Sequence, residues 1–212
     1  MSDSCPPPGR PGTYPSDCEV LDGLRTLARD RVPRHLDDPA LLARASEIKL
    51  LLLDVDGVLT DGTLLYSNNG QESKAFHTQD GFGLRLLHEA GIQTGIITAR
   101  TSEAVARRAA ELKINHLYQG IRNKLDAFGD ISRKTGLKPF EIAYMGDDWL
   151  DLTLLVRVGL AVSPANAVAE VQAACHYTTP RTGGQGAVRD LCDLLIRAQG
   201  LDQQLLQRYL SQ

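Results

Sequence analysis

Two aspartates that follow a run of four leucines are the first residues in this 212-residue chain whose spacing suggests chemistry. The segment 50–57 reads Leu-Leu-Leu-Leu-Asp-Val-Asp-Gly, a pattern typical of a buried strand that ends at a carboxylate. Because side chains alternate along an extended backbone, Asp54 and Asp56 point the same way. Two neighbouring carboxylates repel each other unless a cation lies between them or one carries a proton. The pair indicates a Mg²⁺ site with one nucleophilic carboxylate and one acid/base; a plain Asp-x-Asp-Gly turn is the alternative.

A calcium-binding loop that begins at Asp54 is excluded. Such a loop needs a glutamate at its twelfth position, where this chain has Leu65. It also follows a helix, whereas the residues before Asp54 predict a strand.

Three further polar clusters follow candidate strands. Thr98 ends an apolar run and offers a hydroxyl, with backbone N–H groups of the next helix, to an anion. Lys124 opens a helix, where a cation is unfavourable by ~0.3–1 kcal/mol, which suggests that it neutralises a phosphate. Asp147, Asp148 and Asp151 are more carboxylates than helix capping needs and suit a hard cation. Each cluster alone has a simpler explanation: a turn, an exposed lysine or a helix cap.

The order and spacing of these groups carry more information than any one group. Forty-four residues lead from Asp54 to Thr98, 26 more to Lys124 and 23 more to Asp147. Each group stands at a predicted strand end or at the helix start just after it. In open α/β sheets, ligands bind beyond the carboxyl ends of the strands. The spacing therefore predicts one site at this edge of a sheet.

Residues 46–200 alternate short apolar runs with amphipathic stretches, which predicts an α/β fold. We expect a Rossmann-like, doubly wound parallel sheet with helices on both faces. The predicted strands are Ile48–Asp54, Gln93–Thr98, His116–Gln119, Ile142–Met145, Leu160–Val162 and His176–Thr178. The predicted helices are Gly83–Ala90, Ser102–Leu112, Lys124–Thr135, Asp148–Val158, Ala165–Ala173 and Gly186–Ala198.

One segment departs from this alternation. The extended runs Thr63–Ser67 and Gln71–Phe76 flank Asn68-Asn69-Gly70, and Asn-Gly between two such runs predicts a β-hairpin. This hairpin would form a flap after the first strand.

Composition excludes several classes of protein. The chain has 23 Lys plus Arg against 26 Asp plus Glu, and this near-neutral balance argues against a nucleic-acid partner. Its longest apolar run, Leu50–Leu53, is far shorter than the ~20 residues that cross a bilayer. No secretory signal is recognisable, and the four cysteines form no CxxC pair. We expect a soluble cytoplasmic protein with no membrane partner.

Residues 1–45 form a proline-rich extension, with seven of the ten prolines in the first 39 positions. Met1–Pro15 is predicted to be disordered, and Cys18–Ala45 to form short helices broken at Pro33 and Pro39. The predicted domain follows at 46–200, and 201–212 form a C-terminal tail.

The four polar clusters resemble the motifs of the haloacid dehalogenase superfamily of phosphotransferases. The matching residues are Asp54–Thr60, Thr98, Lys124 and Gly146–Asp148. Segments outside these motifs resemble one branch, the 3-deoxy-D-manno-octulosonate 8-phosphate phosphatases, which supply the sugar acid of lipopolysaccharide. Those segments are Lys74–Phe76, Asp80-Gly81, Leu117–Gly120, Gly183–Arg189 and Ala198–Gly200. Sialic acid phosphatases are close relatives with the same layout.

The resemblance implies roles for four catalytic residues. Asp54 would attack the phosphorus and form an aspartyl-phosphate. Asp56 would protonate the leaving alkoxide and then deprotonate the attacking water. Thr98 and Lys124 would hold the phosphoryl oxygens and offset their charge.

The resemblance also implies the metal ligands. Mg²⁺ would be held by Asp54, the backbone carbonyl of Asp56 and Asp147, with Asp148 nearby in support. Asp151 would contact these ligands and not the ion itself.

A cap domain, which many relatives insert, has no room in this chain, so a lone protomer would leave its site open to water. The family closes such sites by forming homotetramers, and the matching pieces here are the hairpin 63–76 and the glycine-rich loop 182–186. For that loop, a flexible turn before the last helix is the alternative. The residues implied to bind substrate are Thr63, Asp80, Thr98, Ala99, Arg100, Lys124, Gly183, Gly184 and Gly186.

Three positions depart from the branch. An Arg is common where this chain has Gln79 and Gln185, and a Gly where it has Ala99. Two cations that could pair with a sugar carboxylate are therefore missing, and charged hydrogen bonds contribute roughly 1.5–3 kcal/mol each. The cations left to compensate are Arg100, Arg181 and Arg189.

The leading hypothesis is a Mg²⁺-dependent phosphatase for a sugar-acid phosphate, with 3-deoxy-D-manno-octulosonate 8-phosphate as the first candidate. A sialic acid 9-phosphate or another sugar phosphate is the alternative substrate. A phosphomutase is less expected, because it usually needs a cap that excludes water. A non-catalytic oligomeric scaffold of the same fold would predict loss of the nucleophile or acid/base, and both are present.

Overall fold

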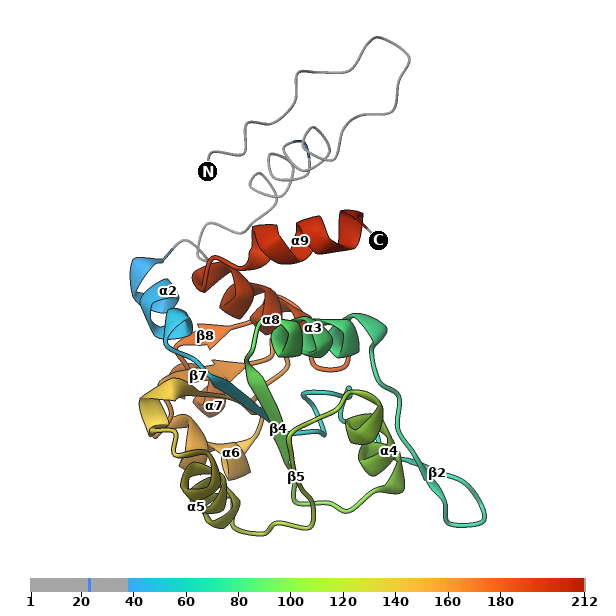
Figure 1. Cartoon of the computed structure of the whole chain (residues 1–212). Helices are drawn as coiled ribbons and strands as arrows, with labels where there is room; N and C mark the ends of the chain where they lie inside the picture. The colour runs from blue at the N-terminus through green and yellow to red at the C-terminus, as the bar shows by residue number, and fades with distance from the viewer. Residues whose placement is uncertain (1–22, 24–37, 212) are drawn as a thin grey trace, which may run out of the picture.

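A computed structural model describes residue 23 and residues 38–211 of the chain (Figure 1). Its centre is a six-stranded parallel sheet in the order β5-β4-β1-β6-β7-β8. The strands are β1 (Leu50–Leu53), β4 (Gln93–Ile97), β5 (His116–Tyr118), β6 (Ile142–Met145), β7 (Leu160–Ser163) and β8 (Tyr177–Thr178). The chain runs outward from β1 in both directions, which confirms the predicted doubly wound sheet.

The central strand β1 divides the interior into two cores. Leu51 and Leu53 face one hydrophobic cluster, and Leu50 and Leu52 face the other. All four side chains are fully buried. Because successive side chains of a strand point to opposite faces, an all-apolar strand needs cover on both sides of the sheet.

Helices provide that cover as two layers (Figure 1). The layer over Leu51 and Leu53 contains α2 (Pro39–Ser46), α3 (Thr78–Glu89), α4 (Glu103–Glu111), α8 (Ala187–Ala198) and α9 (Asp202–Leu210). The layer over Leu50 and Leu52 contains α5 (Lys124–Thr135), α6 (Trp149–Leu155) and α7 (Ala169–Ala174). A short 3₁₀ helix, η2 (Pro139–Glu141), leads into β6.

Helix α3 begins five residues earlier than its sequence pattern predicts. The prediction started at Gly83, but the helix already contains Gly81. A Cβ atom added at Gly81 would lie 2.2 Å from the Arg108 side chain of α4, and one at Gly83 would lie 3.0 Å from Arg189 of α8. The glycines therefore mark close packing against two helices, which local sequence does not reveal.

Helix α2 belongs to the core although it lies in the proline-rich region. Asp38 caps it by accepting a hydrogen bond from Ala40, and proline is well tolerated at the first helical position. Leu41 and Ala45, one turn apart, are buried in the core that α8 also lines. The predicted domain boundary between residues 45 and 46 falls within this helix. Apart from residue 23, the predictions for residues 1–37 lie outside the described residues.

Helix α9 lies in the predicted C-terminal tail, for which the sequence predicted no helix. Leu205 is 5% exposed, and Tyr209 meets the edge of Phe82 with ring centroids 5.3 Å apart. The Tyr209 hydroxyl also donates to Glu89 at 2.7 Å. The helix is therefore attached to α3 by both apolar and polar contacts.

The predicted hairpin is present, with shorter strands than expected. Strand β2 (Leu65–Tyr66) pairs antiparallel with β3 (Glu72–Ser73), and Gly70 takes the positive φ of +80° that its turn requires. The hairpin projects from the body of the molecule (Figure 1). Between β1 and α3 the structure holds only this hairpin and its flanking loops, so no cap domain is inserted there.

Within the described residues, no helix combines the length and apolar character needed to span a membrane.

Replacing a central leucine tests the two-core architecture. Leu51→Ala should lower the free energy of unfolding by about 2–5 kcal/mol, because it leaves a cavity beneath fully buried β1. Leu64→Ala, at a hairpin residue that is 43% exposed, should change it by no more than about 0.5 kcal/mol. Urea unfolding followed by circular dichroism measures both, and equal losses would contradict the assigned core.

Candidate active site

The four polar clusters meet at one edge of the sheet. Strand β1 lies between β4 and β6, with Leu53 paired to Ile96 on one side and to Met145 on the other. The residues that follow these strands, Asp54, Thr98 and Asp147, therefore emerge side by side. Lys124, the first residue of α5, reaches into the same place.

Lys124 is a buried cation held by two carboxylates. Its side chain is 2% exposed, and its Nζ lies 2.9 Å from Asp54 Oδ2 and 2.6 Å from Asp151 Oδ1. It also donates to the Tyr144 hydroxyl at 3.0 Å. Burial alone would lower the pKa of Lys124, but the two carboxylates outweigh it and leave the pKa raised. The lysine therefore stays charged beside Asp54.

Asp151 is fully buried, and both of its carboxylate oxygens are engaged. One oxygen accepts from Lys124 at 2.6 Å and from the Tyr144 hydroxyl at 2.5 Å. The other accepts the backbone N–H groups of Asp147 at 2.9 Å and Asp148 at 3.2 Å. A carboxylate has about four acceptor positions, and Asp151 uses all of them. It therefore orients Lys124 and the loop that carries Asp147.

The acidic cluster fits a divalent cation. One carboxylate oxygen each from Asp54, Asp147 and Asp151 lies within 4.8 Å of the others. Burial raises the pKa of Asp147 to about 7, with Asp151 and Asp54 adding to the shift. Burial likewise raises the pKa of Asp54 to about 6, although Lys124 opposes it. Carboxylate oxygens are suitable ligands for Mg²⁺, and Asp54 and Asp147 are the two whose oxygens remain available.

Asp148 is exposed and caps α6. Its side chain accepts from the backbone of Trp149 at 2.7 Å, while Asp151 accepts from the Asp148 backbone. This reciprocal capping matches the simpler explanation that the sequence left open for Asp148. A supporting contact to the metal ion remains a prediction.

The glycine-rich loop lies against the loop that follows β1 in its own chain, residues 54–62, which is the candidate catalytic loop. Gly184 N–H donates to the Val58 carbonyl at 3.0 Å, and a Cβ at Gly183 would lie 1.8 Å from the Gly57 carbonyl oxygen. The Asn166 amide joins the two loops, donating to Gly57 at 3.1 Å and accepting from Gly183 at 2.7 Å. From the sequence, this loop was predicted to close the site of a neighbouring subunit, and no role was predicted for Asn166.

Asp80 accepts hydrogen bonds from the backbone where that loop ends and α8 begins. It was predicted to contact substrate, yet it is only 1% exposed. Its carboxylate oxygens accept backbone N–H groups from Gly186 at 3.3 Å and Arg189 at 2.8 Å. Burial raises the pKa of Asp80, and these hydrogen bonds oppose the shift.

The other predicted substrate contacts differ in accessibility. Thr98 is 2% exposed, and its hydroxyl accepts the Arg100 N–H at 3.3 Å. Ala99 and Thr63 are exposed, and Thr63 N–H donates to Asp61 at 2.8 Å. Arg100 is 39% exposed and lies beside the catalytic loop, with its Nε 3.9 Å from Asp56 Oδ2.

Comparison with known sequences identifies the family of this chain. A model of the haloacid dehalogenase-like hydrolases matches residues 117–190. The chain is also 47% identical over 160 residues to the 3-deoxy-D-manno-octulosonate 8-phosphate phosphatase of Escherichia coli K12, which covers 76% of this chain and 85% of that protein. The chain belongs to this phosphatase family of haloacid dehalogenase-like hydrolases.

Solved structures of family members share the fold. The Yersinia pestis 3-deoxy-D-manno-octulosonate 8-phosphate phosphatase is 41% identical with a TM-score of 0.76, covering 77% of this chain and 88% of its own. The Moraxella catarrhalis phosphatase, solved with magnesium, phosphate and KDO, is 43% identical with a TM-score of 0.75. That match covers 76% of this chain and 94% of the other.

All three arginines that could replace the cations this chain lacks are paired with acidic side chains, Arg100 with Glu72 at 2.5 Å. Arg181 binds Asp190 through Nε at 2.8 Å and donates to Gln79 at 3.0 Å. Arg189 binds Asp193 at 2.7 Å. Of the three, Arg100 alone has a carboxylate of the catalytic loop within 4 Å among the described contacts.

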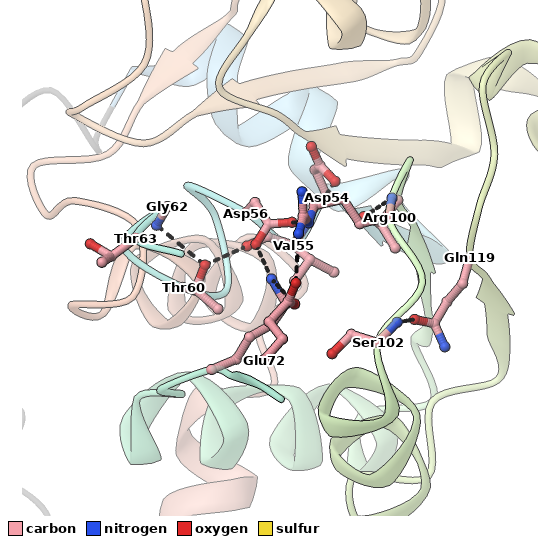
Figure 2. Close-up of polar contacts among 12 residues, drawn as sticks. Asp54, Val55, Asp56, Thr60, Gly62, Thr63, Glu72, Arg100, Ser102 and Gln119 are labelled. Atoms are coloured by element: carbon pink, nitrogen blue, oxygen red, sulfur yellow. Dashed lines mark hydrogen bonds and ion pairs between the residues drawn. The ribbon is translucent and has the colours of Figure 1, made fainter. Parts of the chain in front are cut away.

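Glu72 and Lys74 also lie at the candidate site, although neither was assigned a role from the sequence. Both come from the hairpin segment, and Lys74 bridges Glu72 and Asp56. Figure 2 shows Glu72 approaching Asp56 from the hairpin. A signal was available, because residues two apart in an extended segment face the same way.

Magnesium should stabilise this site in a pH-dependent manner. The pKa values of Asp54 and Asp147 are raised in the folded protein. Between about pH 4 and 7 the metal-free folded protein therefore binds more protons than the unfolded chain does. The free energy of unfolding then falls as pH rises through that range. Protons then compete with Mg²⁺ at pH 5 and hardly at pH 8. The rise in melting temperature on adding Mg²⁺ should therefore be larger at pH 8, where a concentration of 100 Kd stabilises by about 2.7 kcal/mol.

The matched variants are Asp147→Asn, which should lose most of the magnesium-induced shift, and Asp202→Asn in α9, which should keep it. Differential scanning fluorimetry measures all of these shifts. A pH-independent shift, or a full shift in Asp147→Asn, would show that the ion binds elsewhere.

Proposed function

We propose that this chain is a Mg²⁺-dependent phosphatase that hydrolyses 3-deoxy-D-manno-octulosonate 8-phosphate to 3-deoxy-D-manno-octulosonate and phosphate, a step toward lipopolysaccharide. One observation carries the proposal: a chain 47% identical to the Escherichia coli enzyme also brings Asp54, Lys124 and Asp147 together. The magnesium, phosphate and KDO in the Moraxella catarrhalis structure support the same substrate class.

Asp54 is proposed as the nucleophile. Its Oδ1 accepts the Val55 N–H at 2.7 Å, and its Oδ2 faces Lys124 at 2.9 Å. These contacts fix the carboxylate at the end of rigid β1. A carboxylate oxygen would form a bond to phosphorus while the bond from phosphorus to the sugar oxygen breaks. Water would then attack the phosphorus of the aspartyl-phosphate and release phosphate.

Asp56 is proposed to move the proton in both steps. It would give a proton to the departing sugar oxygen and later take one from the attacking water, so that it ends as it began. Asp54, the Asp56 backbone carbonyl and Asp147 would hold Mg²⁺, which when bound would supply positive charge beside the phosphoryl group.

Thr98 and Lys124 are proposed to hold the phosphoryl oxygens. Lys124 already lies beside Asp54, and the buried Asp151 keeps it there. In phosphoryl transfer, positioning and electrostatic stabilisation make up most of catalysis. Lys124 can therefore act without moving far from its place in the structure.

Arg100 is the proposed partner of the substrate's sugar carboxylate, because it is a partly exposed cation beside Asp56. A sialic acid 9-phosphate also carries a carboxylate, so it is the alternative substrate. A comparison of kcat/KM for the two phosphates decides between them.

Phosphate release tests the activity and the nucleophile. The protein should release phosphate from 3-deoxy-D-manno-octulosonate 8-phosphate with Mg²⁺ and lose this turnover in EDTA. Asp54→Asn should reduce kcat by at least about 10³-fold with an unchanged circular dichroism spectrum, because the amide is a poor nucleophile. Asp61→Asn, an exposed control seven positions on, should stay within a few-fold of wild type. Turnover in EDTA, or in Asp54→Asn, would refute the proposed chemistry, and absence of turnover would favour the scaffold alternative.

A homotetramer is proposed to close the site. The hairpin carries exposed Leu65 and Tyr66, and α6 carries exposed Trp149 and Leu150 next to Asp148. Apolar side chains gathered around an uncapped site are suited to cover by a neighbouring subunit. A cytoplasmic location remains a prediction from the sequence, which cell fractionation would test.

Light scattering tests the assembly. The wild type should have the mass of four chains, and Leu65→Glu with Tyr66→Glu should dissociate it, because charge would be placed in an apolar interface. Phe140→Glu, at a residue that is 54% exposed and lies away from the hairpin in sequence, serves as the control. A monomeric wild type with full activity would contradict this proposal.

A further inference from the structure

Lys74 is a buried cation that the proposed mechanism does not use. Its side chain is 1% exposed, although it follows a short strand in a largely exposed hairpin. Its Nζ bonds to Asp56 Oδ1 and lies 3.2 Å from Glu72 Oε1. A charge withdrawn from water must be paired, so the Lys74 side chain is held by these two carboxylates.

Glu72 also binds a second cation, Arg100. Its Oε2 accepts from Arg100 Nη2 at 2.5 Å, and that nitrogen also donates to the Tyr66 hydroxyl at 2.8 Å. The Arg100 hydrogen bond is the main cause that lowers the pKa of Glu72. Two carboxylates and two cations therefore alternate in a ring of Asp56, Lys74, Glu72 and Arg100.

The two oxygens of Asp56 have different surroundings in this ring. Oδ1 bonds to Lys74, whereas Oδ2 has Arg100 Nε at 3.9 Å, beyond hydrogen-bond distance. One oxygen is therefore anchored, and the other is left to exchange a proton. Without the anchor, the Asp56 side chain could rotate about two torsions, and proton transfer needs hydrogen-bond reach in one geometry.

We propose that Lys74 is a positioning residue that anchors Asp56, so that its second oxygen meets the leaving oxygen of the substrate. The proposal rests on the phosphatase activity proposed above and adds a role for the hairpin in it. The phosphorus–sugar oxygen bond breaks as the Asp54–phosphorus bond forms, and the proton passes from Asp56 Oδ2 to the sugar oxygen. Attack by water on the aspartyl-phosphate then returns a proton to Oδ2.

The competing explanation is that Lys74 only pins the hairpin to the catalytic loop. The two explanations differ in how the rate depends on the leaving group. p-Nitrophenolate leaves as a stable anion without a proton, whereas phenolate and a sugar alkoxide depend more strongly on one. A misplaced Asp56 should slow phenyl phosphate and sugar phosphate more than p-nitrophenyl phosphate, while a damaged fold should slow all three equally.

The test is kcat/KM, which reports steps up to formation of the aspartyl-phosphate, measured on the full chain with Mg²⁺. Lys74→Met should lose about 10²-fold or more on phenyl phosphate and 3-deoxy-D-manno-octulosonate 8-phosphate, and only a few-fold on p-nitrophenyl phosphate. Lys74→Arg should recover most of this selective loss because it retains the charge. Lys49→Met, which removes an exposed lysine paired with Glu141 at 2.6 Å, should leave all three rates unchanged.

An equal loss on all three substrates in Lys74→Met, or no loss, would overturn the proposal. If Lys74→Met does not fold, Glu72→Gln provides the test, because it retains Lys74 but weakens the contact that holds it. Its loss of kcat/KM should be smaller and should again be greater for the substrates with poor leaving groups. Equal losses in Glu72→Gln would then be decisive against it. If the wild type hydrolyses the aryl phosphates but not the sugar phosphate, the proposed substrate fails while the aryl pair still decides the role of Lys74.

Discussion

The buried ion pair between Lys124 and two carboxylates is the constraint on which the rest of the site depends. A lysine with 2% exposure is stable only where opposite charge compensates its lost hydration, and here Asp54 and Asp151 do so. Asp54 follows β1, Asp151 lies in α6 and Lys124 begins α5, so one cation ties three elements together. The same contact sets the position of Asp54, the proposed nucleophile, relative to the groups proposed to hold the phosphoryl oxygens.

Close backbone packing makes room for these charges. A Cβ on Gly57 would lie 1.9 Å from Asp147 Oδ2, and one on Gly146 would lie 2.3 Å from Asp151 Cγ. Gly57 also has a φ of +84°, which favours glycine. The two glycines let the loops after β1 and β6 approach so closely that their carboxylates form one cluster. Burial, with the neighbouring carboxylates adding to it, raises the pKa of Asp147, and the clustered oxygens suit a divalent cation.

Prediction from the sequence succeeded where the signals are local. Helix α5 has the predicted bounds because Asn123 caps its start and Gly136, with φ of +71°, ends it. Strand alternation and the order of the motifs likewise predicted the sheet and the edge where Asp54 and Asp147 meet. Contacts between distant segments left no such signal: the amide of Asn166 joins residues more than 100 positions apart along the chain, at 57 and 183. The buried position of Lys74 depends in the same way on a partner 18 residues away.

Helix α2 affects how the proline-rich segment can be studied. Leu41 and Ala45 fill the core beside α8, and Arg44 donates to the Gly159 carbonyl at 3.1 Å. A shortened protein that starts at Ser46 would therefore expose apolar surface of the catalytic domain as well as losing the extension. Any loss of assembly or solubility in it would reflect that exposed surface and could not be assigned to a missing partner contact. A start at Asp38 keeps the helix cap and separates the two effects.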